Sequence, residues 1–493
     1  MGDYVVGIDV GTTGTKTMLF SADGTTSAHT YVGYKLENPA LGYSEQNSED
    51  WWKAVCGTVR EVLKKCPDPE NVRAISLSLQ GGTVVPVDEK GNPLRPAIVW
   101  NDTRCRKERE EFERIYGSSY MYEKTGWRLS DGLPALEIRW MKDNEPDIFD
   151  RTAMFLSVPD YISLRMTGRA VADVADAGIN QLYDIRAEEY DENLLRFAGI
   201  SAGQLPDVVH TGDVIGHLTA EAAAALGLSE RTVLVAGAHD QYAVAVGAGA
   251  DKAGDILIGS GTCWVVTAIS SKPRFDTGFS QSVAAVRGMW GSILSLSTGG
   301  VCLDWLRKNI AVGEDGEEYI GYDRINEELK NRFPAKERLF FYPFSGYFGG
   351  REEFGKAAFT GLDLSHDRYD MFAAVMEGVA FQIAWMLEAF QEYRTCGCLR
   401  LAGGASKSRV WSQIVADITG HAVLIPSVPD LACVGAAVIA GTGCGVYRSV
   451  EEGCRALAVS GKIVEPDPEK SRQYQSCFAD YKECAKKIGE LYH

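Results

Sequence analysis

The first part of the chain alternates apolar runs with polar, glycine-rich turns. Residues 5–10 are apolar apart from Asp9, residues 11–16 form a polar turn with two glycines, and apolar residues return at 17–20. A further turn at 22–24 leads into another extended stretch. This pattern predicts an antiparallel meander of strands, whereas a Walker phosphate loop would lead from its glycines into a helix.

The same layout returns in the second half of the chain, where residues 255–267 form an apolar run, a Gly-Ser-Gly-Thr turn and another apolar run. The repeat predicts two related α/β domains. A glycine- and alanine-rich stretch at 246–254 predicts a boundary between domains 1–250 and 251–493, with a hinge there. Other expected strands are 71–79, 84–87, 98–100, 232–237, 398–401 and 423–425, and expected helices are 108–116, 135–142, 368–393 and 406–419.

The charge balance excludes some classes of partner. The 493 residues include 50 Lys and Arg against 67 Asp and Glu, a formal net charge of −17, which argues against nucleic acid or an anionic membrane as the main partner. No apolar run approaches the roughly 20 residues that span a bilayer, and the first residues lack a basic segment leading into an apolar one. We therefore expect a cytoplasmic protein.

The cysteines and histidines do not predict a metal site. Twelve cysteines are scattered along the chain, and only Cys396 and Cys398 lie close together, without a second pair. We expect all of them to be reduced thiols packed in cores. The seven histidines show no His-Glu-x-x-His pattern, so no structural or catalytic metal cage is expected.

The turn at 11–16 has the parts of an anion-binding site: two glycines, three hydroxyls, successive backbone N–H groups and the cation of Lys16. A β-hairpin turn with polar tips would explain the same residues. Asp9 favours the anion site, because a carboxylate in an apolar strand is costly to bury without a partner such as hydrated Mg²⁺ or Lys16. The uncharged turn at 259–262 could be a mere turn, but its repetition favours two facing hairpins that hold successive phosphates.

Asp240 is the strongest candidate for catalysis. It follows the apolar run 233–237 and precedes a helix of small residues, so we expect it at the carboxyl end of a strand, where α/β sheets bind ligands. A plain helix N-cap would explain it too. A helix N-terminus also favours the ionised carboxylate, which suits an acceptor for a hydroxyl proton.

Three further strand ends are candidate ligand contacts. Residues 78–83 and 100–104 combine an indole with amide, carboxylate and guanidinium groups, a mixture that suits a polyhydroxylated ligand. A buried Trp and a surface turn would explain each segment alone. At 402–408, small residues between a strand and a helix allow a flat or phosphate-bearing ligand to approach the backbone, although a glycine pair there is often only a turn.

Taken together, these segments resemble the FGGY family of carbohydrate kinases. Residues 357–362 and 370–377 fit the family's C-terminal pattern at every specified position, and residues 435–437 are similar as well. The resemblance implies an α/β fold of two actin-like, ribonuclease H-like ATPase domains with a cleft between them. Domain 1–250 would bind the sugar and domain 251–493 the nucleotide.

The resemblance also implies ligands and residue roles. Asp240 would accept the proton of a substrate hydroxyl as it attacks the γ-phosphorus of ATP, and Asp9 would hold hydrated Mg²⁺. The ligands would be ATP, Mg²⁺ and a small sugar or polyol, and a homodimer is compatible with the resemblance. The implied substrate-binding residues are Gln80, Gly81, Gly82, Trp100, Asp240 and Gln241. The implied nucleotide-binding residues are Gly11, Thr12, Thr13, Lys16, Gly261, Thr262, Gly300, Gly403, Gly404, Ala405 and Ser408.

The reaction is defined more closely than the substrate. The overall pattern is closest to xylulokinases, which usually carry Gln-Met-His-Gly where this chain has Gln-Gly-Gly-Thr at 80–83. The pocket is therefore expected to be wider and to lack one hydrogen-bonding partner for D-xylulose, so D-xylulose is expected to be at best a modest substrate. Gln241 is more similar to the glycerol kinases, whose Arg-Glu-Thr segment is absent here.

We predict ATP-dependent phosphorylation of a sugar or polyol hydroxyl by a xylulokinase-like enzyme. The alternative substrate is another ketose, polyol or sugar acid, such as glycerol or gluconate. Two alternatives come from other classes: an actin- or Hsp70-like ATPase that drives a partner, and a sugar-binding regulator.

Overall fold

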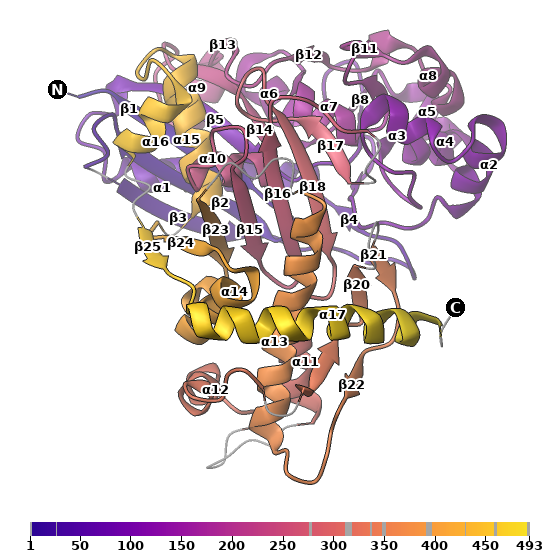
Figure 1. Cartoon of the computed structure of the whole chain (residues 1–493). Coiled ribbons are helices and arrows are strands. Elements are labelled where there is room, and N and C mark those ends of the chain that lie inside the picture. Colours follow the sequence, from indigo (N-terminus) through magenta and orange to yellow (C-terminus); the bar gives the residue numbers. More distant parts are fainter. Residues whose placement is uncertain are drawn as a thin grey trace.

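The computed structural model describes residues 2–25, 27–275, 279–310, 318–335, 338–347, 352–390, 397–428, 430–457 and 461–490. Two large sheets, one from each half of the sequence, form the framework, and helices lie on their faces (Figure 1). Strands alternate with helices along the chain, which confirms the predicted α/β class.

The N-terminal sheet has six strands. Their order is β13 (Val214–His217), β14 (Val233–His239), β5 (Val72–Leu79), β1 (Tyr4–Val10), β2 (Gly14–Ser21) and β3 (Ser27–Gly33). β1 is antiparallel to β2 and parallel to β5, and β5 is parallel to β14. β1 to β3 are the predicted meander. β1 is buried along its whole length, as expected for an apolar central strand covered on both faces.

Helices cover both faces of this sheet. On one face, α1 (Ser48–Leu63), α6 (Val158–Thr167) and α9 (Ala220–Leu226) build a core around residues such as Trp51. On the other face, α10 (Asp240–Gly247) packs with α15 (Leu431–Gly443).

Helix α15 comes from the second half of the sequence but packs on the N-terminal sheet. Gly247 and Gly435 let α10 and α15 touch, because a Cβ on either would lie 1.9 Å from a backbone oxygen of the other helix. The pair therefore ties the second half of the chain to the first. The domain boundary at residue 250 remains a prediction.

A helical region lies beside the N-terminal sheet and has its own core, in which the rings of Phe112 and Phe197 are 5.0 Å apart. Its helices are α2 (Arg106–Tyr116), α3 (Tyr120–Thr125), α4 (Pro134–Asn144), α5 (Pro146–Arg151) and α8 (Glu192–Ala198). The short elements of this half are β4 (Glu45–Gln46), η1 (Pro69–Asn71), β6 (Val85–Val87), β7 (Ala97–Ile98), β8 (Met154–Leu156), β9 (Val171–Asp173), α7 (Val174–Ile179), β10 (Tyr183–Asp184), β11 (Glu189–Tyr190), η2 (Ala202–Gln204) and β12 (Asp207–Val209).

The C-terminal sheet repeats the pairing of the first. Its order is β17 (Ser280–Val283), β18 (Trp290–Leu296), β16 (Trp264–Ser270), β15 (Ile256–Ser260), β23 (Cys398–Gly403), β24 (Ala422–Pro426) and β25 (Gly461–Val464). β15 is antiparallel to β16 and parallel to β23, as β1 is to β2 and β5. From β18 to β25 the pairing directions match those from β3 to β13. The predicted repeat is therefore a structural repeat, with β17 added at one edge.

The C-terminal helices surround a large apolar core. Helix α13 is long and apolar enough to cross a membrane by length and composition, which differs from the sequence expectation, but 94% of its apolar window is buried within the protein. It is therefore a core helix. The other elements are α11 (Gly300–Asn309), α12 (Tyr322–Leu329), β19 (Phe340–Tyr342), β20 (Ser345–Tyr347), β21 (Glu352–Phe354), β22 (Ala358–Thr360), α13 (Arg368–Glu388), η5 (Ala405–Lys407), α14 (Arg409–Thr419), α16 (Val450–Ala456) and α17 (Pro468–Glu490).

Some predicted details were wrong. The helix expected from residue 406 begins three residues later, because the Ser408 hydroxyl caps it by accepting a hydrogen bond from the Trp411 backbone N–H at 3.0 Å. The helix expected to reach residue 393 ends at Glu388, and residues 391–396, with Cys396, lie outside the described residues. Cys263 is exposed, so the cysteines are not all packed in cores.

Candidate active site

A charged cluster occupies the hairpin between β1 and β2. Lys16 lies opposite Asp9 in the strand register, and its Nζ lies 3.3 Å from Asp9 Oδ2 and 2.9 Å from Asp430 Oδ2. Asp430 is the N-cap of α15, so the hairpin is bound to the helix from the second half. Asp9 Oδ1 also accepts a hydrogen bond from the Ser78 hydroxyl at 2.9 Å.

The two members of the central ion pair are shifted in pKa by different causes. Burial raises the pKa of Asp9 to about 6; Lys16 opposes this shift, while Asp430 and Asp240 add to it. Burial would lower the pKa of Lys16, but the two carboxylates outweigh it and raise that pKa. Lys16 therefore stays charged, whereas a further cation beside Asp9 would help to ionise that carboxylate.

Asp9 fits Mg²⁺ only as a ligand of a hydrated ion. The described residues contain no group of three or more His, Cys, Asp or Glu side chains that could hold a metal. Mg²⁺ commonly keeps several waters and binds through one or two carboxylates together with substrate phosphates. A single buried carboxylate beside a lysine is consistent with that mode of binding.

Asp240 is the first residue of α10, directly after β14. It is not the N-cap, which is His239. Its side chain is 38% exposed, and it lies beside the His239 imidazole, whose Nδ1 is 3.3 Å from Asp240 Oδ1. The carboxylate makes no hydrogen bond within the described part of the chain, so it is available to a ligand.

The hairpin loop is joined by hydrogen bonds to the predicted sugar-binding residues. The Thr12 hydroxyl donates to Gln80 Oε1 at 2.9 Å and accepts from Trp100 Nε1 at 3.0 Å. Gln80 is buried, and its Nε2 donates to Gln46 Oε1 at 3.0 Å. Trp100 remains 49% exposed. Thr12, predicted as a nucleotide contact, thus lies with the residues predicted to bind sugar.

The pocket is not widened at residues 81 and 82. A Cβ on Gly81 would lie 2.6 Å from His239 Cδ2 and 2.8 Å from Asp176 Oδ1. Gly82 has a φ of +68°, and a Cβ there would lie 2.5 Å from Leu133 Cδ2. Neighbouring side chains fill the space that larger residues would take, so the expectation of extra width was wrong.

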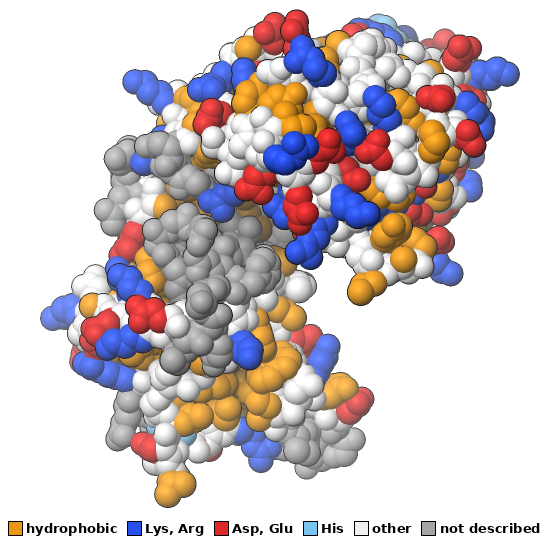
Figure 2. All heavy atoms as spheres, turned by 90° about the vertical axis from the view of Figure 1, so that its right-hand side faces the viewer, with side chains coloured by type: hydrophobic (Ala, Val, Ile, Leu, Met, Phe, Trp, Pro, Cys, Tyr) orange, Lys and Arg blue, Asp and Glu red, His pale blue; other side chains and the backbone are white. Residues whose placement is uncertain are grey.

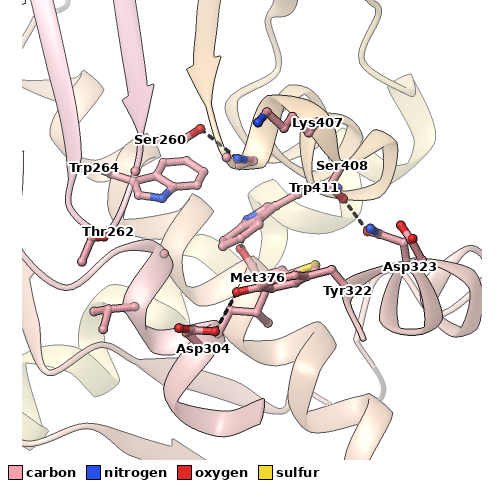
Figure 3. Close-up of a pocket in the computed structure, with 17 residues that line it drawn as sticks. Ser260, Thr262, Trp264, Asp304, Tyr322, Asp323, Met376, Lys407, Ser408 and Trp411 are labelled. Atoms are coloured by element: carbon pink, nitrogen blue, oxygen red, sulfur yellow. Dashed lines mark hydrogen bonds between the residues drawn. The ribbon is translucent and has the colours of Figure 1, made fainter. Parts of the chain in front are cut away.

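The C-terminal half contains a pocket of about 500 Å³ between β15, the start of α11, α12 and the turn before α14 (Figure 3). Its size is within the roughly 300–1,000 Å³ of small-molecule sites. Of the predicted nucleotide contacts, Gly261, Thr262, Gly300, Gly404, Ala405 and Ser408 line it. Gly403 does not, and Gly11, Thr12, Thr13 and Lys16 lie on the N-terminal hairpin.

Aromatic and polar side chains complete this pocket. The rings of Trp264 and Trp411 are 5.2 Å apart, and Figure 3 shows both, with Tyr322, facing the same space. Trp264 Nε1 is buried and has no hydrogen-bond partner among the residues that the structure describes. Tyr322 donates its hydroxyl hydrogen to Asp304 Oδ1 at 2.7 Å. Flat rings beside carboxylate and amide groups suit a nucleoside, whose base can stack and whose hydroxyls can hydrogen-bond.

The turn at 403–405 is built by the close approach of β15. Gly403 has a φ of +97°, and a Cβ there would lie 2.5 Å from the Ser260 backbone oxygen. That oxygen accepts from Gly404 N at 2.6 Å, and the Ser260 hydroxyl accepts from Ala405 N at 3.1 Å. Gly403 therefore shapes the turn, while its two successors line the pocket.

Both halves of the chain match one family. Residues 4–247 match the N-terminal domain, and residues 255–444 the C-terminal domain, of the FGGY family of carbohydrate kinases. The chain belongs to this family.

Two relatives of this FGGY kinase are named for different substrates. Xylulose kinase of Bacillus subtilis (strain 168) is 30% identical over 490 residues, which are 97% of this chain and 96% of that protein. Gluconokinase of the same strain is 28% identical over 450 residues, 89% and 87% of the two chains. The crystal structure of xylulose kinase from Rhodospirillum rubrum superimposes with a TM-score of 0.90 at 26% identity, covering 99% of this chain and all of that one.

The FGGY kinase structure brings together residues that the sequence left apart. Asp430 and Gln46 were missed, because nothing local marks a helix cap or an edge-strand glutamine as part of a site. Trp264 and Trp411 resemble ordinary core residues in sequence. Gln241 lies half-buried on α10 beside Asp240, and its ligand contact remains a prediction.

Seen from the side, the enzyme is indented between an upper and a lower lobe (Figure 2).

Proposed function

We propose that this FGGY kinase transfers the γ-phosphoryl group of ATP to a hydroxyl of a neutral sugar of the xylulose type, with Asp240 accepting the hydroxyl proton. The observation that carries the proposal is the position of Asp240: a half-exposed carboxylate without a hydrogen-bond partner in the described residues, at the end of β14 and within electrostatic reach of Asp9. Such a group can accept a proton from a hydroxyl at hydrogen-bond distance.

The 500 Å³ pocket would take the nucleoside, with Trp264 and Trp411 as its aromatic wall. The Gly261–Thr262 turn and the hairpin with Lys16 would then hold the phosphates from the two halves. Asp9 would hold hydrated Mg²⁺, whose charge neutralises phosphate oxygens during transfer. Alignment and charge neutralisation supply most of the acceleration in phosphoryl transfer, and closure of the two lobes would exclude water as a competing acceptor.

Charge near Asp240 favours a neutral sugar over a sugar acid. Asp240 and Asp9 are both carboxylates, and the nearby cation, Lys16, is already paired with Asp9 and Asp430. A sugar carboxylate in this place would add a like charge. The filled space at Gly81 also removes extra width as a reason to expect D-xylulose to be only a modest substrate. Gluconate remains the second candidate, because a gluconokinase is nearly as similar to this chain as the xylulose kinase.

A coupled assay of ADP release tests the proposal. Purified enzyme with Mg·ATP is tested with D-xylulose, L-xylulose, glycerol and D-gluconate, and without sugar. We expect ADP release to depend on sugar, with a xylulose giving the highest kcat/KM. Release that is equal with and without every sugar would favour an ATPase that drives a partner. A higher kcat/KM for gluconate would replace the neutral-sugar assignment. The cytoplasmic location and the homodimer remain predictions.

A further inference from the structure

Unpartnered polar atoms gather around Gly81 and His239. Within the described residues, His239 Nδ1, Asp176 Oδ1 and Trp127 Nε1 are buried and have no hydrogen-bond partner. His239 and Asp176 are the side chains that a Cβ on Gly81 would strike, and the ring of Trp127 lies 5.7 Å from that of His239. Buried polar groups are nearly always hydrogen-bonded in folded proteins. Three such atoms at one place therefore indicate a missing polar ligand.

His239 stands directly beside the reacting group. It precedes Asp240, and its Nδ1 lies 3.3 Å from Asp240 Oδ1. Its ring is 7% exposed and packs between Trp127 and Tyr242. Burial lowers the pKa of His239, with Asp240 opposing the shift, so the imidazole is neutral and offers one donor and one acceptor.

Gly81 provides the room that His239 occupies. Its φ lies outside the left-handed range, so only space requires a glycine there. Ile179 Cγ2, at 2.8 Å from the same Cβ position, closes the third side. β5 and β14 are neighbours, with His239 opposite Leu79. The His239 imidazole, at the end of β14, thus fills the space that a side chain at residue 81, just beyond the end of β5, would occupy.

We propose that His239 is a specificity-determining residue that hydrogen-bonds the sugar hydroxyl next to the one phosphorylated, with Asp176 as its partner in recognition and Gly81 as the residue that makes room for both. This inference rests on the proposed function. The hydroxyl that gives its proton to Asp240 must lie about 2.6–3.2 Å from that carboxylate. Because His239 Nδ1 lies 3.3 Å from Asp240 Oδ1, a hydroxyl on the adjacent carbon of that sugar would be within reach of the imidazole.

A packing role for His239 and a role in binding the sugar predict different effects of removing its side chain. If the ring only fills space between Trp127 and Tyr242, its removal lowers the melting temperature and leaves the order of substrates unchanged. If it binds a hydroxyl, its removal raises KM for the sugar and changes that order, because an unpaired buried group discriminates strongly between ligands.

The test compares kcat and KM for the four sugars and for ATP in wild type, His239→Ala, His239→Gln and Gly81→Ala. His217→Ala, at the end of β13, is the control. We expect His239→Ala to raise KM for the preferred sugar about tenfold while KM for ATP stays within about twofold. His239→Gln, which keeps a donor and an acceptor, should recover part of the loss. Gly81→Ala should lower kcat/KM in the wild-type background, but it should cause little further loss when added to His239→Ala.

Each other result counts against the inference. An unchanged sugar KM and substrate order in His239→Ala, with wild type active, would leave His239 as a packing residue. A Gly81→Ala enzyme with wild-type kcat/KM would remove the steric argument. If His239→Ala does not fold, the sugar KM, the ATP KM and the order of substrates are compared with wild type in His239→Gln and Gly81→Ala instead. Wild type that phosphorylates no sugar would overturn the proposed function, and this inference with it.

Discussion

The hairpins β1–β2 and β15–β16 occupy equivalent places in two sheets of the same topology, yet they differ in chemistry. The first carries Asp9 and Lys16 in register and is bound to Asp430. The second has Gly259 opposite Val265 and an uncharged turn, and it borders a pocket walled by Trp264 and Trp411. One framework, used twice, thus provides a charged turn and a neutral turn beside an aromatic pocket. The comparison teaches that the duplicated fold sets the position of each site, and the side chains at the turn set its role.

The largest expected effect concerns Asp240, the proposed proton acceptor in the N-terminal half. Asp240→Asn keeps the shape of the side chain but cannot accept the proton, so kcat should fall about 10²–10⁴-fold, with melting temperature and ATP affinity nearly unchanged. Asp213→Asn is a matched control, because Asp213 is 39% exposed and Asp240 38%. Steady-state kinetics and calorimetric titration with ATP provide the measurements. A variant that keeps more than about a tenth of wild-type kcat would contradict the assignment.

The charged hairpin should respond next most strongly. Lys16→Met leaves Asp9 and Asp430 without their shared cation, so affinity for Mg·ATP should fall. The free energy of unfolding should drop by about 1–3 kcal/mol, less than for a fully buried pair because Lys16 is 38% exposed. ATP titration and chemical denaturation measure the two effects, and Lys53→Met on exposed α1 surface is the control. Unchanged ATP affinity in Lys16→Met would contradict the proposal that this hairpin contacts the nucleotide.

Buried carboxyls offer a stability test away from both hairpins. Burial raises the pKa of Glu377 on α13 to about 7 from its ordinary value of 4.5, although Tyr474 and the Ala335 N–H donate hydrogen bonds to it. Between pH 4.5 and about 7, Glu377 therefore keeps its proton in the folded protein but releases it in the unfolded chain. The stability present below pH 4.5 is therefore lost as pH rises through about 7.

Glu377→Gln should remove this loss and raise the free energy of unfolding above pH 7 by about 1–3 kcal/mol relative to wild type. Glu388→Gln, near the exposed end of the same helix, should not. Denaturant titrations at several pH values give the difference between variant and wild type, from which the contribution of other titrating groups cancels. A difference independent of pH would show that Glu377 has the same pKa in the folded and the unfolded protein, and that burial does not raise it.

The sequence predicted local features far better than contacts between distant segments. The meander, the repeat and the place of Asp240 follow from turn residues and apolar runs within a few positions. The contact of Asp430 with Lys16 depends on α15 crossing to the other half of the protein, and no local pattern signals it. The missing side chain of Gly81 suggested an open pocket, because the sequence does not show that His239 from a neighbouring strand fills the space.

The smallest expected effect concerns the neutral hairpin. Thr262 offers a single uncharged hydroxyl at the pocket edge, and a neutral hydrogen bond contributes only about 0.5–1.5 kcal/mol, so Thr262→Val should raise KM for ATP about 2- to 10-fold. Thr262→Ser, which keeps the hydroxyl, should stay near wild type, and KM for the sugar should not change in either variant. If the first hairpin neutralises phosphate charge and the second only positions the nucleotide, Lys16→Met should weaken ATP binding more than Thr262→Val does. Equal losses in the two variants would show that both turns contact the phosphates in the same way, and the division of roles between the two halves would then be wrong.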